Sequence, residues 1–191
     1  SCLVCGENFT FGSKGAGNIQ TLSSFTQEHN CKLIVRPLVS DNQEVISSTA
    51  IRHLIAAGEV AKAQHMLGRV YTLSGTVVLG NQRGNTIGFP TANLALEATK
   101  IAVPQIGVYA VKVYIDGKCY KGMANIGKNP TFGDVEEARL EANIFDFNGN
   151  LYGKEITVAF IERIRGEVKF ASVDALVEQI KKDKETCLNL L

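Results

Sequence analysis

The chain has 191 residues, 45% of them apolar, and a formal net charge of +1 at pH 7. This length fits one domain, or one domain plus part of another. A near-zero net charge gives no basic surface of the kind that nucleic-acid-binding proteins use. No apolar run is long enough to cross a membrane. The composition therefore indicates a globular protein, and we expect neither nucleic acid nor a membrane among its partners.

The cysteines predict free thiols. There are five of them, and their odd number and scattered spacing argue against a disulfide framework. Cys2 and Cys5 form a single Cys-x-x-Cys pair, whereas a structural zinc site would need a second pair. We expect a reducing compartment and a cytoplasmic location.

The first third of the chain alternates between strand-like and helix-like segments, which favours a parallel sheet. The expected elements are a strand over 3–11, a helix over 19–29, a strand over 31–38, and helices over 47–57 and 59–67. Ser47 or Ser48 would cap the fourth element. Gly68 suits the position just after the last helix, so we place a domain boundary there.

From Val70 onward the apolar pattern has a period of two, which predicts a barrel or sandwich. The expected strands cover 70–79, 109–115, 118–126, 140–144 and 156–160. Asp116-Gly117 predicts a hairpin turn, and Asn148-Gly149 predicts a turn after the fourth strand. Ser172 would cap a final helix. Its expected apolar face is Val173, Leu176, Val177, Ile180 and Leu188.

The segment Gly88-Phe89-Pro90-Thr91-Ala92-Asn93 carries the most chemistry. In an extended chain Thr91 and Asn93 point to the same side and offer two neutral oxygens to one point. Mg²⁺ prefers oxygen ligands and is often shared between few protein groups and substrate phosphates. The glycine-rich loop before the segment suits phosphate. A proline turn followed by a polar strand end is the alternative.

Glu141 is the candidate for proton transfer. Leu140, Ala142 and Ile144 share one strand face, so Glu141 lies on the other, beside Asn143. A carboxylate in mid-strand needs a reason, because burying a charge is costly. A solvent-facing glutamate on the outer surface is the alternative.

These motifs resemble the riboflavin kinase family from about Gly68 to the C-terminus. The resemblance rests on the 88–93 segment and on Pro104-Gln105-Ile106-Gly107-Val108-Tyr109, Ala124-Asn125-Ile126-Gly127, Asn129-Pro130-Thr131-Phe132, Leu140-Glu141, Leu151-Tyr152-Gly153 and Lys169-Phe170. Before Gly68, Gly6-Glu7-Asn8-Phe9-Thr10-Phe11-Gly12 and Ile46-Ser47-Ser48-Thr49-Ala50-Ile51-Arg52 resemble the later part of a flavin adenylyltransferase. Together they resemble the bacterial bifunctional riboflavin kinase/FAD synthetases.

The resemblance implies an α+β chain in two parts. Residues 1–68 would be part of a Rossmann-like α/β nucleotidyltransferase (FAD synthetase) domain. Residues 69–191 would be a riboflavin kinase domain, a Greek-key β-barrel with a C-terminal helix. It also implies phosphoryl transfer from ATP to riboflavin, giving FMN, with Mg²⁺ as cofactor.

The resemblance also assigns roles to single residues. Glu141 would be the general base, and Thr91 and Asn93 the Mg²⁺ ligands. The nucleotide would contact Gly80, Arg83, Gly84, Gly88 and Pro90. A flap carrying Arg165 and Phe170 would contact the flavin; a charged connector with one anchoring Phe is the alternative. In the first part, Ser47, Ser48, Thr49 and Arg52 would bind phosphate at a helix start.

Three departures from the family pattern qualify these expectations. Asn143 stands where a histidine is frequent, and Asn85 lies where a basic residue is frequent. The chain contains no His-x-x-His motif, so we expect adenylyl transfer to FMN to be absent.

A non-catalytic barrel that binds flavin or nucleotide is the alternative to the kinase. A nucleic-acid-binding barrel is disfavoured, because single-strand binders need basic grooves with aromatic platforms.

Overall fold

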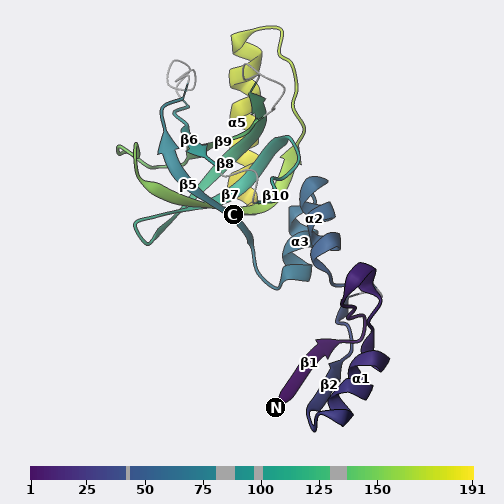
Figure 1. Ribbon diagram of the computed structural model, residues 1–191. Coiled ribbons are helices and arrows are strands. Elements are labelled where there is room, and N and C mark those ends of the chain that lie inside the picture. Colours follow the sequence, from purple (N-terminus) through teal and green to yellow (C-terminus); the bar gives the residue numbers. More distant parts are fainter. Residues whose placement is uncertain (42–43, 81–88, 97–100, 130–136) are drawn as a thin grey trace. The chain divides into compact units, whose positions relative to one another are not determined.

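The computed structural model describes residues 1–41, 44–80, 89–96, 101–129 and 137–191 (Figure 1). The chain forms two compact units, Ser1–Ala50 and Ile51–Leu191. The division falls inside the helix that the sequence predicts near Ser48, and the domain boundary at Gly68 stays a prediction. None of the described helices is both long enough and apolar enough to pass through a lipid bilayer.

The first unit contains a two-stranded parallel sheet and one helix, as its alternating pattern predicts. Its elements are β1 (Cys2–Gly6), η1 (Ser13–Gly15), α1 (Ile19–Glu28), β2 (Lys32–Arg36), β3 (Ser40–Asp41) and β4 (Glu44–Val45). Asn18 caps α1 by accepting hydrogen bonds from the backbone N–H groups of Gln20 and Thr21. The prediction that the first strand reaches residue 11 is wrong. β1 ends at Gly6 because its partner β2 ends at Arg36.

Two short helices precede the barrel. α2 (Ser48–Ala56) and α3 (Val60–Leu67) are separated at Gly58, and Gly68 ends α3 in the left-handed conformation with φ 65°. That conformation is easiest for glycine, which lacks a Cβ. α3 contacts β5 and β10 of the barrel, and its Val60 is fully buried in the barrel core. The predicted helices and the terminal glycine are therefore confirmed.

Six antiparallel strands close into a barrel in the order β10-β5-β6-β9-β8-β7 (Figure 1). They are β5 (Tyr71–Val78), β6 (Ala92–Ala95), β7 (Gly107–Ile115), β8 (Lys118–Asn129), β9 (Glu137–Ile144) and β10 (Glu155–Arg165). β7 and β8 meet at Asp116-Gly117, where both residues have positive φ, as a tight hairpin turn requires. The five predicted strands and this hairpin are confirmed, and β6 is an additional strand.

The barrel interior is the main apolar core. The shared face of β7 predicted from period two is buried, with Tyr109, Val111 and Val113 fully inaccessible to solvent. The predicted turn at Asn148-Gly149 is present only as a bend at Gly149, and the chain first leaves β9 through a turn at 145–146, where Asp146 has φ 54°. Aspartate tolerates the left-handed region better than most residues, so it can make this turn.

A last helix, α5 (Val173–Leu190), lies against the outside of the barrel and contacts β7, β8 and β10. Ser172 caps it by accepting a hydrogen bond from the Ala175 N–H at 3.2 Å. The inward face consists of Leu176, Ile180, Asp183 and Cys187, at helical spacing. The predicted face is wrong at its two ends, because Val173 and Leu188 are 61% and 41% exposed.

Candidate active site

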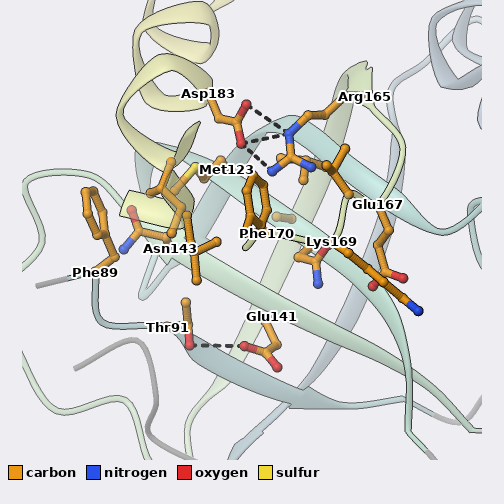
Figure 2. A pocket seen from close by; sticks show the side chains of 16 residues that line it. Phe89, Thr91, Met123, Glu141, Asn143, Arg165, Glu167, Lys169, Phe170 and Asp183 are labelled. Atoms are coloured by element: carbon orange, nitrogen blue, oxygen red, sulfur yellow. Dashed lines mark hydrogen bonds and ion pairs between the residues drawn. The ribbon is translucent and has the colours of Figure 1, made fainter. Parts of the chain in front are cut away.

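A cavity of about 850 Å³ lies on the outer face of the barrel and is bounded by α5 (Figure 2). Its wall is formed by Phe89, Thr91, Val108, Met123, Ala124, Asn125, Glu141, Asn143, Arg165, Glu167, Val168, Lys169, Phe170, Leu176, Ile180 and Asp183. The cavity is large enough for a small organic molecule, and its mixture of apolar surface and a few polar groups is typical of ligand sites.

Strand register brings the polar residues of this face together. Glu141 of β9 pairs with Asn93 of β6 on one side and with Asn125 of β8 on the other. Residues directly opposite each other in an antiparallel sheet point to the same face. Leu140 and Ala142 lie in the barrel core, so Glu141 is on the outer face. The predicted alternation around Glu141 is therefore confirmed.

Thr91 lies immediately before β6 and contacts this carboxylate. Its hydroxyl donates to Glu141 Oε2 at 3.3 Å (Figure 2). The backbone that carries Thr91 is itself held, because Asn143 Nδ2 donates to the Pro90 carbonyl at 2.6 Å. Asn143, the departure from the family pattern, thus fixes the proline segment to β9.

Asn93 is 5% exposed and does not line the cavity. Its Oδ1 accepts a hydrogen bond from Arg139 Nε at 2.7 Å and another from Arg139 Nη2. Arg139 also forms an ion pair with Glu141, with Nε 3.1 Å from Oε1. Sequence reasoning missed Arg139. The signal was present, since a residue two before Glu141 shares its strand face.

Gly80 lies against the Asn93–Arg139 pair. A Cβ at this position would collide with the Asn93 carboxamide and come within 2.6 Å of Arg139 Nη2. Only glycine allows this close approach. Arg83, Gly84 and Gly88 lie outside the described residues.

Pro90 and Thr91 line a second cavity of about 380 Å³ together with residues of the 147–152 segment.

Arg165 and Phe170, the two predicted flavin contacts, both line the larger cavity. The Arg165 guanidinium lies 5.8 Å from the centre of the Phe170 ring. Its Nε and Nη2 donate to the Asp183 carboxylate of α5 at 3.0 and 2.7 Å. Asp183 is 3% exposed and also accepts from Gln179 Nε2 at 2.9 Å. This buried pair fixes the guanidinium at the cavity wall.

Asp183 was also missed from the sequence. It follows Leu176 and Ile180 at helical spacing, so an acidic residue lies within the apolar face of α5. A charged side chain in such a position generally has a partner. That irregularity was the available signal.

One residue of the predicted phosphate site has a structural role. Ser47 Oγ accepts a hydrogen bond from the Ala50 N–H at 3.1 Å and so caps α2. Ser48, Thr49 and Arg52 are exposed. Phosphate binding by these four residues stays a prediction.

The oxygens near Glu141 are chemically suited to Mg²⁺. The described residues contain no cluster of three His, Cys, Asp or Glu side chains that could hold a metal by themselves. Thr91 and Asn93 supply neutral oxygens, and Glu141 supplies negative charge. Mg²⁺ is commonly held by few protein groups, with substrate phosphates and water completing its shell. The Arg139 guanidinium contacts two of these groups, Asn93 and Glu141, which shows that a cation can be held at this position.

The fold and this cavity define a closed six-stranded barrel with a ligand-sized cavity between its outer face and α5. The riboflavin kinase family model matches residues 67–191, and the FAD synthetase family model matches residues 1–50. The chain therefore belongs to the riboflavin kinase family, and its first 50 residues are similar to FAD synthetases. The resemblance seen in the sequence motifs is confirmed.

Individual relatives agree with this assignment. The bifunctional riboflavin kinase/FMN adenylyltransferase of Bacillus subtilis is 40% identical over 97% of this chain, and that of Haemophilus influenzae is 41% identical over 96%. A crystal structure described as a macrolide-efflux protein from Streptococcus pneumoniae is 45% identical over 96% of this chain and 59% of its own, with a TM-score of 0.87. The chain spans 58% and 59% of the two enzymes' lengths.

Proposed function

We propose that this chain transfers the γ-phosphoryl group of ATP to the terminal 5′-hydroxyl of riboflavin, giving FMN and ADP. The observation that carries the proposal is the Glu141 carboxylate, 3.3 Å from the Thr91 hydroxyl at a cavity of about 850 Å³. The family match and the names of the relatives supply the substrate class.

Glu141 accepts the proton of the attacking hydroxyl. A positioned general base contributes typically about 10²–10⁴-fold to a rate. The carboxylate is well placed for this because it lines the cavity while its strand is fixed by pairing on both sides. Phosphoryl transfer depends mainly on positioning the reacting groups and on neutralising their charge. The protein can therefore contribute to the reaction with one base held on a rigid frame.

Thr91 and Asn93 hold Mg²⁺ in this proposal. When bound, the ion neutralises phosphate charge and orients the transferred group. Asn143 holds Thr91 in place through the Pro90 carbonyl. Because Gly80 has no Cβ, the backbone at this position can run close to Asn93. The nucleotide lies near Gly80 and Pro90, where the smaller cavity shares Thr91 with the larger one.

The flavin occupies the larger cavity. Its apolar wall includes Phe89, Met123 and Leu176, which suit a flat aromatic ring. Arg165 presents a fixed guanidinium on the same wall, and Phe170 lies beside it. Because Asp183 binds Arg165, the guanidinium is already ordered before a ligand arrives, which reduces the entropy lost on binding.

The test is to incubate the purified chain with riboflavin, ATP and Mg²⁺ and to separate the products by chromatography. We expect FMN and ADP in equal amounts, and neither product when Mg²⁺ is chelated. Riboflavin binding without FMN formation would instead support a non-catalytic flavin-binding module. A cytoplasmic location also stays a prediction, which the five unpaired cysteines support.

A further inference from the structure

We propose that Arg139 is a displaceable cation in the active site. Its guanidinium holds the oxygens of Asn93 and Glu141 in the nucleotide-free protein and leaves them when the Mg²⁺–nucleotide complex binds. Arg139 would then be a positioning residue that sets how tightly the metal is held. This inference rests on the proposed function, because it assumes that Asn93 is a metal ligand.

The first step is that Arg139 satisfies both groups at once. Its Nε lies 2.7 Å from Asn93 Oδ1 and 3.1 Å from Glu141 Oε1. Asn93 is almost fully buried, and a buried carbonyl oxygen without a hydrogen-bond donor costs about 1–3 kcal/mol. Arg139 therefore keeps the asparagine and the carboxylate in one arrangement while no nucleotide is present.

The second step is that this arrangement excludes a metal ion from Asn93. Nε and Nη2 of Arg139 both donate to the Asn93 Oδ1 atom, so the guanidinium lies directly against this oxygen. A divalent cation bound to the same oxygen would also lie within a few ångströms of a guanidinium charge. Asn93 can bind the ion only after Arg139 has moved away.

The third step is that the Arg139 side chain can move away from Asn93 and Glu141. Its side chain is 22% exposed, so one side of it faces solvent. The stem has several rotatable bonds, and moving it requires no change in the pairing of β9. The barrel can therefore stay intact while the guanidinium leaves. The exchange of one cation for another also keeps the negative charge of Glu141 compensated in both states.

The direct test follows the guanidinium by NMR in the full chain labelled with ¹⁵N-arginine. The Nε–Hε signal of Arg139 is assigned by its absence in Arg139→Met. In the free protein we expect a resolved signal that exchanges slowly with water. Saturating Mg²⁺ and ADP should move this signal to the position of solvent-exposed arginines, and ADP with a chelator should not. A signal unchanged by Mg²⁺ and ADP would overturn the proposal.

A second test measures Mg²⁺ affinity by calorimetry in the presence of excess ADP. Removing a competing cation should tighten metal binding, so Arg139→Met should bind Mg²⁺ roughly fivefold or more tightly, the lower end of typical coupling effects. The matched control is Arg69→Met, which removes an equal charge from an exposed arginine whose guanidinium donates to the Val70 carbonyl. Equal or weaker binding in Arg139→Met would contradict the inference.

The outcomes separate this inference from the proposed function. If FMN forms and the Arg139 signal does not respond, the proposed function stands and the displaceable cation is wrong. If the signal responds to Mg²⁺ and ADP but no FMN forms, the displacement stands and the kinase activity is wrong. If ADP with Mg²⁺ does not bind, both are wrong.

Discussion

The hydroxyl of Thr91 and the carboxylate of Glu141 lie 3.3 Å apart although 50 positions separate them in the chain. The register of β6 against β9 brings them together, because Ala92 pairs with Ala142 and Asn93 with Glu141. The proposed base and a proposed metal ligand therefore share one rigid frame. A shift of β6 by one residue against β9 would turn Thr91 away from the face that carries Glu141.

Glu141→Gln should abolish most turnover and leave riboflavin affinity largely unchanged. The amide keeps the size of the side chain but cannot accept the hydroxyl proton, so we expect a rate about 10²–10⁴-fold lower. Single-turnover FMN formation and fluorescence titration with riboflavin measure the two quantities. Glu155→Gln, an exposed glutamate of β10, is the matched control. Wild-type turnover in Glu141→Gln would remove the proposed base.

Gly80→Ala should impair the use of Mg²⁺-ATP and lower stability. The added Cβ would collide with Asn93, which has no room to retreat because it is 5% exposed. Crowding of this kind typically costs about 1–3 kcal/mol. Urea unfolding gives the free energy, and the Mg²⁺ dependence of FMN formation gives the functional effect. A normal Mg²⁺ dependence would show that the displaced Asn93 oxygen is not a ligand.

Asp183→Ala should weaken both folding and flavin binding. It leaves the Arg165 guanidinium without the carboxylate that holds it, and removing one partner of a buried pair costs about 3–5 kcal/mol. Glu178→Ala on the same helix is the control. Its ion pair with Lys181 is exposed, and exposed pairs contribute little to stability. Equal thermal midpoints for the two variants would contradict a stabilising role for Asp183.

Cys187 should resist alkylation in the folded protein. Burial, together with the nearby Asp183 carboxylate, raises the pKa of its thiol from 9.0 to about 12. Iodoacetamide at pH 9 should therefore modify the exposed Cys2 and Cys119 but spare Cys187, as peptide mass spectrometry can show. In urea all three should react. Fast labelling of Cys187 without urea would mean that α5 opens readily.

The same raised pKa has a consequence for stability. Between about pH 9 and 12 the unfolded chain loses the Cys187 proton while the folded chain keeps it. The contribution of this thiol to stability is therefore complete below pH 9 and declines as the pH rises through that interval. The free energy of unfolding of Cys187→Ala should fall less over this interval than that of the wild type.

Local patterns were sufficient to predict much of the barrel. The period-two run from Tyr109 to Ile115 identified a strand and its buried face, and Asp116-Gly117 identified the hairpin. β6 was not counted as a strand, because four residues with a buried asparagine show no clear alternation. It is a strand because β5 and β9 lie on either side of it, and such pairing between distant segments leaves no local signal.

The sequence predicted the site residue whose role follows from its own place in a strand. It predicted less well the residues whose role depends on contact with a distant part of the chain. Glu141 followed from strand alternation and family motifs. Arg139 and Asp183 act through contacts between β9 and β6 and between α5 and β10. Their positions could be noticed in the sequence, but their partners could not be predicted from it. The face of α5 was misplaced because Val173 and Leu188 are apolar without being buried, which is common at helix ends.

The direct pairing of β5 with β10 affects how the barrel can form during synthesis. Ser74 and Thr157, whose hydroxyls lie 2.7 Å apart in this pair, are 83 residues apart in the chain. The last seam therefore cannot close until β10 has left the ribosome, by which time the other five strands are already outside. Closure across so long a segment is slow. Nascent chains that end before Glu155 should consequently expose the apolar interior of the barrel and depend on chaperones.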